Sequence, residues 1–203
     1  MNIAFDVDGV VLKSIEVILD SINRAKGLTI SPEDLAAWEL EPLGLDARTL
    51  NDAVTHLYAQ PRVEAYDGAV QSLSRIYRAY GKPLLFITGR SDPATAQRQL
   101  EALPWNHSVP EMMVTGGNRD KRIYLADNEV DFIIEDDVRH VDDYMAEGFR
   151  VGLMLQPWNR RSKKPVTIKF NGWHDLENWF MEIFPRMKRQ EAGGSLAQSG
   201  NLG

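Results

Sequence analysis

Short apolar runs alternate with amphipathic segments between residues 67 and 155 of this 203-residue chain. A segment with helical spacing precedes each run, and strands that alternate with helices form a mainly parallel sheet with helices on both faces. The runs are typical of buried strands and span residues 83–87, 112–114, 130–134 and 149–155. With a further apolar run at residues 1–5, we expect an α/β fold: a Rossmann-like three-layer α/β/α architecture around a five-stranded sheet.

The segment between residues 14 and 65 is different, because it has helical periodicity and no strand pattern. Residues 14–26 place apolar side chains on one helical face, and residues 46–58 do the same. Ser31 followed by Pro32 is typical of a helix start. The sequence therefore predicts a small helical insert directly after the first strand.

These patterns divide the chain into three parts. We expect a core domain made of residues 1–13 and 66–185, and a helical cap at residues 14–65. Residues 186–203 are polar and rich in Gly and Ser, which predicts a disordered tail. Three late tryptophans are expected to pack the last helix against the sheet: Trp158, Trp173 and Trp179.

Composition narrows the possible functions. The formal net charge is −6, whereas a nucleic-acid surface needs a basic stripe, so we do not expect nucleic acid as the main partner. The absence of cysteine excludes thiol nucleophiles, thiolate metal ligands and disulfides. No apolar run is long enough to span a bilayer, and no charged segment followed by an apolar one marks a secretion signal. We therefore expect a cytoplasmic protein with no membrane partner.

Three of the expected strands end in polar residues. Asp6 and Asp8 come after the first strand, Thr88 closes the second, and residues 135–137, with the sequence Glu-Asp-Asp, close the fourth. In a parallel sheet all strands point the same way, and ligands bind at their carboxyl ends. The sequence therefore predicts one site built from residues more than a hundred positions apart.

The acids at this edge predict magnesium and phosphate chemistry. Carboxylates gathered in one place repel each other unless a cation lies among them, and hard oxygen ligands without His or Cys suit Mg²⁺. A carboxylate in such a site stays ionised and can attack phosphorus. A second acid two residues away can protonate the leaving oxygen and then activate water. Asp6 and Asp8 have this spacing.

Three further positions suit a phosphoryl group. Gly9 would let the chain turn back beneath the substrate and expose backbone N–H groups. Thr88 can hydrogen-bond a phosphate oxygen, and a nearby lysine would neutralise charge on the phosphoryl group. Lys121, at an expected helix start, is the best candidate for that lysine, with Arg119 and Arg122 as close competitors.

Together these motifs resemble the haloacid dehalogenase (HAD) superfamily of phosphohydrolases, over residues 1–155. The matching motifs are Asp-Val-Asp-Gly-Val at residues 6–10, Phe-Ile-Thr-Gly-Arg at 86–90, Lys121, and Ile-Ile-Glu-Asp-Asp at 133–137. Phosphatases of the superfamily keep the second acid of the first motif and dehalogenases lack it, so Asp8 favours phosphate chemistry. Val10 departs from the family pattern, in which Thr is commoner.

The resemblance implies a role for each matched residue in a catalytic core that uses Mg²⁺. Asp6 would be the nucleophile and Asp8 the acid/base, while Thr88 and Lys121 would hold the phosphoryl group. The implied metal ligands are Asp6, Asp8 through its backbone carbonyl, Asp136 and Asp137. The implied substrate-binding residues are Gly9, Thr88, Gly89, Arg90 and Lys121.

Three features resemble the deoxyribonucleotidase-like branch of the superfamily. They are the first motif, the helical insert directly after it, and the late sequences Gln-Pro-Trp-Asn-Arg at 156–160 and Glu-Asn-Trp at 177–179. This resemblance implies a 5'-nucleotidase that acts on (deoxy)nucleoside monophosphates, with the insert as a cap that closes over the site. Polynucleotide-kinase-type 3'-phosphatase domains are a rival resemblance, around residues 88–90 and the acidic pair.

Several assignments stay open on the sequence alone. The alternative functions are a phosphatase of another small phosphoester or of a nucleic-acid 3'-phosphate, and a non-catalytic binding scaffold. Glu135 could replace Asp136 or Asp137 as a metal ligand, and Arg90 could contact phosphate or pair with the acids. Trp38 and Tyr58, in the expected cap, could stack on a base or simply reflect helical amphipathicity.

Overall fold

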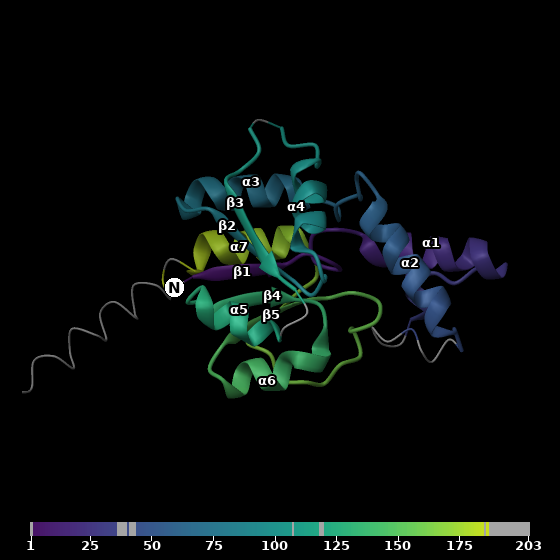
Figure 1. Ribbon diagram of the computed structural model, residues 1–203. Coiled ribbons are helices and arrows are strands. Elements are labelled where there is room, and N and C mark those ends of the chain that lie inside the picture. Colours follow the sequence, from purple (N-terminus) through teal and green to yellow (C-terminus); the bar gives the residue numbers. More distant parts are fainter. Residues whose placement is uncertain are drawn as a thin grey trace, which may run out of the picture.

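The computed structural model describes residues 2–35, 40, 44–106, 108–117, 120–184 and 186. Within these residues, six parallel strands form one sheet in the order β3-β2-β1-β4-β5-β6 (Figure 1). They are β1 (Ile3–Asp6), β2 (Leu84–Thr88), β3 (Met112–Gly116), β4 (Phe132–Glu135), β5 (Arg150–Met154) and β6 (Ile168–Phe170). β1 is buried along its whole length and lies between β2 and β4, in the middle of the sheet.

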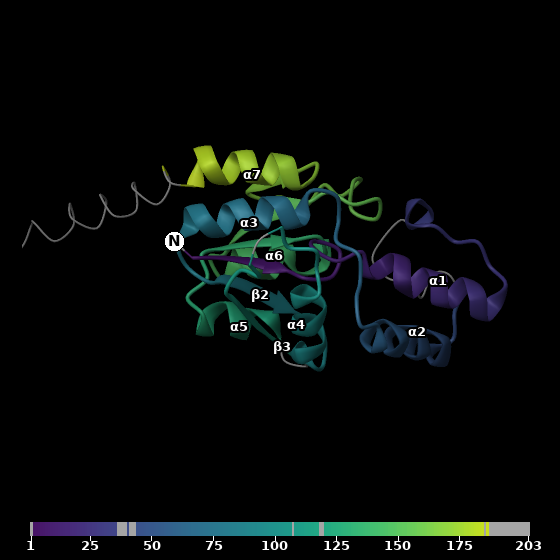
Figure 2. The same cartoon turned by 90° about the horizontal axis from the view of Figure 1, so that it is seen from above.

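Helices cover both faces of the sheet. They are α3 (Ala69–Tyr80), α4 (Pro93–Glu101), α5 (Lys121–Asp127), the 3₁₀-helix η3 (Val138–His140), α6 (Val141–Ala146) and α7 (Trp173–Glu182). α3 and α7 lie together on one face and α5 on the other (Figure 2). Successive β1 side chains point to opposite faces, so Phe5 packs with Trp173 of α7, while Ala4 shares a core cluster with Leu125 of α5.

The predicted α/β class and the parallel three-layer architecture are confirmed, but the predicted strand number of five is wrong. β6 adds a sixth strand beside β5. It has only three residues, and its middle residue, Lys169, is exposed. So short a segment carries too little apolar pattern to predict a strand. The predicted packing of Trp173 and Trp179 against the sheet is confirmed.

The segment after β1 contains helices and no strand within the described residues. These are α1 (Ser14–Lys26), the 3₁₀-helix η1 (Pro32–Asp34) and α2 (Ala47–Ala59). α1 and α2 pack against each other at one side of the core (Figures 1 and 2). Trp38 lies outside the described residues. So do residue 185 and residues 187–203, which make up all of the predicted tail except residue 186.

Two neighbouring backbone segments connect these helices to the core. Leu12 pairs with Ala65 in an antiparallel bridge. Beside it, the Lys13 N–H group donates to the carbonyl oxygen of Glu64 at 2.8 Å. These two backbone contacts hold α1 and α2 next to the end of β1, which is followed by the polar residues of the first motif.

No helix in the described part of the chain has both the length and the apolar character that a membrane span needs.

Candidate active site

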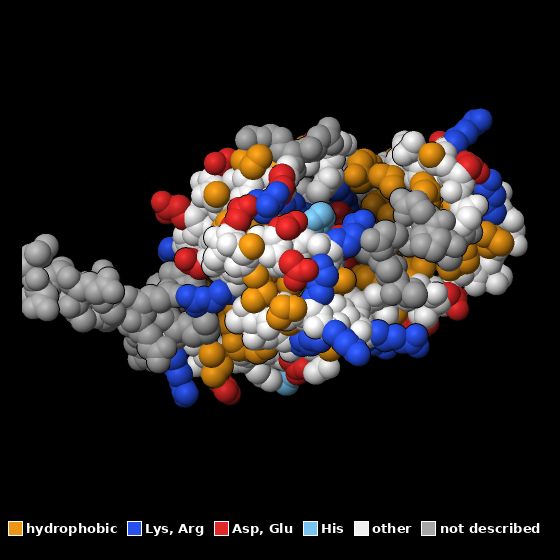
Figure 3. All heavy atoms as spheres, turned by 90° about the horizontal axis from the view of Figure 1, so that it is seen from below, with side chains coloured by type: hydrophobic (Ala, Val, Ile, Leu, Met, Phe, Trp, Pro, Cys, Tyr) orange, Lys and Arg blue, Asp and Glu red, His pale blue; other side chains and the backbone are white. Residues whose placement is uncertain are grey.

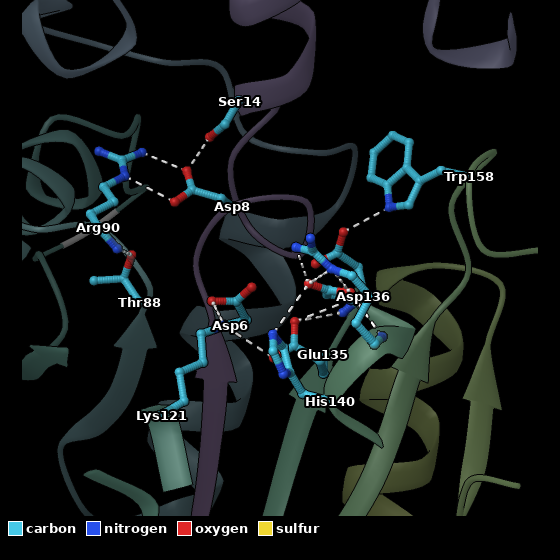
Figure 4. Close-up of polar contacts among 12 residues, drawn as sticks. Asp6, Asp8, Ser14, Thr88, Arg90, Lys121, Glu135, Asp136, His140 and Trp158 are labelled. Atoms are coloured by element: carbon cyan, nitrogen blue, oxygen red, sulfur yellow. Dashed lines mark hydrogen bonds and ion pairs between the residues drawn. The ribbon is translucent and has the colours of Figure 1, made fainter. Parts of the chain in front are cut away.

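Three buried acids meet where β1 and β4 end side by side. Asp6 is the last residue of β1, Glu135 is the last residue of β4, and Asp136 follows directly. Each contributes a carboxylate oxygen to a group in which all these atoms lie within 4.8 Å of one another (Figure 4). We call these residues the acid cluster. The parallel pairing of the two strands brings their carboxyl ends to the same edge, as the sequence predicts.

Lys121 reaches the acid cluster from the first turn of α5. Its Nζ atom lies 2.8 Å from Asp6 Oδ1 and 3.0 Å from Glu135 Oε2 (Figure 4). Arg122, one of its competitors, pairs with two acids outside the cluster. The other competitor, Arg119, lies outside the described residues. Among the candidates that the structure describes, Lys121 is therefore the cation that lies next to Asp6.

One lysine does not neutralise three carboxylates. Burial and the charge of Glu135 raise the pKa of Asp6 well above its usual range, although Lys121 opposes this effect. Burial and the same neighbouring charge raise the pKa of Asp136 in the same way. Burial by itself would lower the pKa of Lys121, but the charges of Asp6 and Glu135 raise it. The three carboxylates thus carry more negative charge than Lys121 can neutralise, and they offer only hard oxygen donors, which fit a magnesium ion.

The two aspartates that follow β4 point in different directions. Asp136 Oδ2 accepts a hydrogen bond from Trp158 Nε1 at 2.9 Å, inside the site. Asp137 precedes η3, and its carboxylate accepts hydrogen bonds from the backbone and guanidinium of Arg139 at 2.7–3.0 Å. The geometry therefore favours Glu135, the alternative that the sequence leaves open, over Asp137 as the second acid beside a metal. Metal binding by Asp137 stays a prediction.

Asp8 lies beside the acid cluster and has its own partners. Arg90 donates to it from Nε at 2.9 Å and from Nη2 at 2.6 Å, and the Ser14 hydroxyl donates to it as well (Figure 4). Burial by itself would raise the pKa of Asp8, but the charge and hydrogen bonds of Arg90 outweigh burial and lower it. Of the two roles that the sequence allows for Arg90, the structure shows the pairing with an acid.

Small residues shape the backbone around the acids. Gly9 has a φ of +82°, and a Cβ atom at this position would overlap the carboxylate of Asp136. Thr88 is fully buried at the end of β2, where its Oγ1 accepts the backbone N–H of Arg90 at 3.2 Å. Gly89 and Arg90 line the cavity above the acids. The phosphate contacts predicted for these residues stay predictions.

The loop after β5 supplies site residues that the sequence motifs do not predict. The sequence predicts that Trp158 packs the last helix, but it packs against α1 and donates to Asp136. The Asn159 amide donates to the backbone carbonyl of Asp136 at 2.8 Å, and the Gln156 amide donates to the carbonyl of Gly9 at 2.6 Å. Their position in the sequence is the one feature that indicates a site role, because these polar side chains also follow the carboxyl end of a strand.

A cavity of about 750 Å³ lies above the acids, and Figure 3 shows the hollow between the core and the cap. Asp6, Asp8 and Lys121 line its floor. The ring of Tyr58, whose centre is 5.3 Å from Arg90 Cζ, covers the guanidinium from the cap side. The cap wall is mostly apolar and consists of Ile15, Ile18, Leu40, Leu50, Val54, Leu57 and Tyr58, next to Ser14.

By sequence, the chain matches no family model and no curated protein. By structure, it is similar to a conserved haloacid dehalogenase-like protein of unknown function from Agrobacterium tumefaciens, with 19% identity over 87% of this chain and 95% of that chain and a TM-score of 0.60. It is also similar to CbbY from Rhodobacter sphaeroides, solved in complex with phosphate, with 15% identity over 86% and 95% of the two chains and a TM-score of 0.57.

A third similar structure is the HAD-hydrolase YfnB from Bacillus subtilis, solved bound to magnesium. It shares 12% identity over 88% of this chain and 97% of its own, with a TM-score of 0.57. Identities this low show the fold alone, but the similarity covers nearly the whole of each neighbour. The expected superfamily fold is therefore confirmed: the chain has the fold of the haloacid dehalogenase-like hydrolases.

Proposed function

We propose that this protein is a Mg²⁺-dependent phosphomonoester hydrolase that works through an aspartyl-phosphate on Asp6. The proposal rests on the residues that surround Asp6. It is buried at the end of the central strand, Lys121 Nζ lies 2.8 Å away, and Asp8 stands two residues further on. All three line the floor of a cavity between the core and the cap. This arrangement suits a nucleophile, a cation for the phosphoryl group and an acid/base.

The residues of the chain account for both halves of the reaction. In the first, the Asp6 carboxylate attacks phosphorus, and Asp8, which must take up a proton beforehand because Arg90 lowers its pKa, gives that proton to the leaving oxygen. In the second, Asp8 takes a proton from a water molecule, the resulting hydroxide adds to phosphorus, and Asp6 is released with inorganic phosphate. Lys121 and Thr88 hold the non-bridging phosphoryl oxygens and stabilise their charge during both transfers.

Mg²⁺ would be held by the carboxylates of Asp6 and Asp136 and by the backbone carbonyl of Asp8. Glu135 would lie beside it as the third acid of the cluster, since its carboxylate shares the group within 4.8 Å. When bound, the ion supplies electrostatic stabilisation of the negative charge on the phosphoryl group. The raised pKa values of Asp6 and Asp136 support this assignment, because burial and the charge of Glu135 raise them and a bound cation would favour the ionised forms.

We further propose that the substrate is a (deoxy)nucleoside monophosphate. The cavity of about 750 Å³ is large enough for more than a phosphate group, and its cap wall is mostly apolar. A nucleotide would place its phosphate on the charged floor and its planar base against that wall. The resemblance of the first and late motifs to the deoxyribonucleotidase-like branch supports the same substrate. Other small phosphoesters are the alternative that the first experiment compares.

The first experiment screens purified protein against a panel of phosphate monoesters with Mg²⁺ and with EDTA. We expect phosphate release that requires Mg²⁺ and is fastest with a nucleoside 5'-monophosphate. Asp6→Asn should lower turnover by about 10³-fold or more, because the nucleophile is lost. The fold should survive, since Asp6 is buried and burial disfavours the ionised form that the substitution removes.

Asp143→Asn is the matched control, because Asp143 is an exposed acid on α6 outside the cavity. It should retain full turnover. Release that persists in Asp6→Asn would contradict the covalent mechanism. Well-folded protein that releases phosphate from no ester would favour the binding-scaffold alternative, and a preference for sugar phosphates would contradict the nucleotidase assignment alone.

A further inference from the structure

The buried side chain of Gln99 links the cap to the edge of the active site. Gln99 belongs to α4 and is only 1% exposed. Its amide nitrogen donates to the backbone carbonyls of Leu57 at 2.9 Å and Gln60 at 2.8 Å, at the C-terminal end of α2. Its amide oxygen accepts a hydrogen bond from Arg90 Nη1 at 2.8 Å. One side chain thus contacts the cap on one side and the partner of Asp8 on the other.

Only one orientation of the Gln99 amide satisfies these neighbours. Backbone carbonyls accept hydrogen bonds and cannot donate, whereas a guanidinium donates and cannot accept. The amide nitrogen must therefore face α2, and the amide oxygen must face Arg90. A rotated amide would set donor against donor and oxygen against oxygen in a buried place, which is costly. The orientation of Gln99 is consequently fixed by its surroundings.

The fixed amide in turn fixes Arg90. The guanidinium is planar and rigid, so holding Nη1 against Gln99 at 2.8 Å, with the Thr95 hydroxyl at 3.5 Å, restricts the directions in which Nε and Nη2 can point. Those two atoms donate to Asp8 at 2.9 and 2.6 Å. Tyr58 of α2 covers the face of the same guanidinium, 5.3 Å from its ring centre, and Arg90 is 2% exposed. The position of the Asp8 carboxylate therefore depends on Gln99 through Arg90.

We infer that Gln99 is a positioning residue for Asp8. Gln99 holds the Arg90 guanidinium against the carboxylate of Asp8, the acid/base, and links that guanidinium to cap helix α2. This inference rests on the proposed function, because it uses the role of Asp8 as the proton donor to the leaving group. Gln99 contacts none of Asp6, Lys121 or the other acids through the hydrogen bonds described above. Its loss should therefore impair proton donation more than nucleophilic attack.

Two substrates separate these effects. 4-Nitrophenyl phosphate has an acidic leaving phenol that departs without protonation, whereas an alkyl phosphate departs as an alkoxide and needs a proton. The ratio kcat/KM reports the steps up to departure of the leaving group. For Gln99→Met we expect kcat/KM to fall by about 10- to 100-fold on the best alkyl phosphate of the panel. On 4-nitrophenyl phosphate the loss should stay below about threefold.

A control and a double-mutant cycle accompany this measurement. Gln97→Met makes the same substitution at an exposed position of α4, and it should leave kcat/KM unchanged for both substrates. In an Arg90→Ala background, Gln99→Met should produce no further change in the alkyl-to-aryl ratio, because Gln99 acts through Arg90. If Gln99→Met does not fold, Gln99→Asn, which shortens the side chain, tests the same selective loss.

Equal loss on both substrates, or a further additive loss in the Arg90→Ala background, would overturn the positioning role and leave the proposed function intact. Wild-type protein that hydrolyses neither substrate in the presence of Mg²⁺ would overturn the proposed function, and the role of Gln99 with it. A selective loss on the alkyl phosphate that disappears in the Arg90→Ala background supports the inference.

Discussion

Gly9 is the residue at which the backbone comes closest to the acid cluster. A Cβ atom there would overlap the Asp136 carboxylate, and its φ of +82° lies in the left-handed region. We expect Gly9→Ala to displace Asp136 and weaken Mg²⁺ binding by about tenfold or more, with a matching loss of turnover. The backbone conformation should add a stability loss of about 1–2 kcal/mol. Calorimetric titration with Mg²⁺ and urea unfolding measure the two effects.

Gly81 provides the matched control for this prediction. It has a φ of +67° at the end of α3, and a Cβ atom there meets nothing within 4 Å. Gly81→Ala should therefore cost a similar backbone energy and leave both Mg²⁺ affinity and turnover unchanged. Normal Mg²⁺ affinity in Gly9→Ala would show that the close approach to Asp136 has no role in the metal site.

Among the single elements, we expect α2 to contribute most to the choice of substrate in the proposed reaction. Leu50 and Val54 of this helix line the cavity opposite the charged floor. Burying a leucine-sized apolar surface contributes about 1.5–3 kcal/mol. We therefore expect Leu50→Ser to raise KM for the preferred nucleotide by about tenfold with little change in kcat, because the reacting groups lie on the core. Steady-state kinetics over a range of nucleotide concentrations measures both constants.

Asn51→Ser is the control on the same helix, since Asn51 is exposed and does not line the cavity. Its KM should equal that of the wild type. An unchanged KM in Leu50→Ser would mean that the leaving group does not contact the α2 wall. A large fall in kcat with unchanged KM would instead assign Leu50 to the placement of the cap over the core.

At the scale of the whole molecule, the acid cluster couples stability to pH. Asp6 and Asp136 have raised pKa values, so the folded protein binds their protons more tightly than the unfolded chain does. Their contribution to stability is complete below the unfolded pKa of about 4 and is lost as pH rises through the raised folded values. The lowered pKa of Asp8 acts the other way, and its contribution is lost only as pH falls in the acid range.

Mg²⁺ should therefore stabilise the protein most at high pH. Binding requires the ionised carboxylates and removes their mutual repulsion, so the gain in Tm over EDTA should be larger at about pH 8 than at about pH 5. Thermal unfolding followed by circular dichroism measures this difference, and Asp136→Asn should reduce it. A gain that is equal at both pH values would contradict the assignment of these carboxylates as metal ligands.

Local patterns in the chain already specify the fold class and the edge of the sheet that carries the site. Alternation of strands and helices is a local pattern, and parallel strands place their carboxyl ends together whatever the loops do. This is why Asp6, Glu135 and Asp136 lie close together, with Lys121 beside them, at the edge that the sequence predicts. β6 escaped prediction because three residues, one of them exposed, carry almost no periodic signal.

The pairing of the polar side chains depends instead on contacts between distant parts of the chain. Asp136 and Asp137 are adjacent in sequence, yet one points into the acid cluster and the other caps η3. Gln99 looks like an ordinary helix residue until the fold brings it within hydrogen-bonding distance of both α2 and Arg90. The physical reason is the same in both cases. The direction of a buried polar side chain is set by donors and acceptors distant in sequence, which no local pattern records.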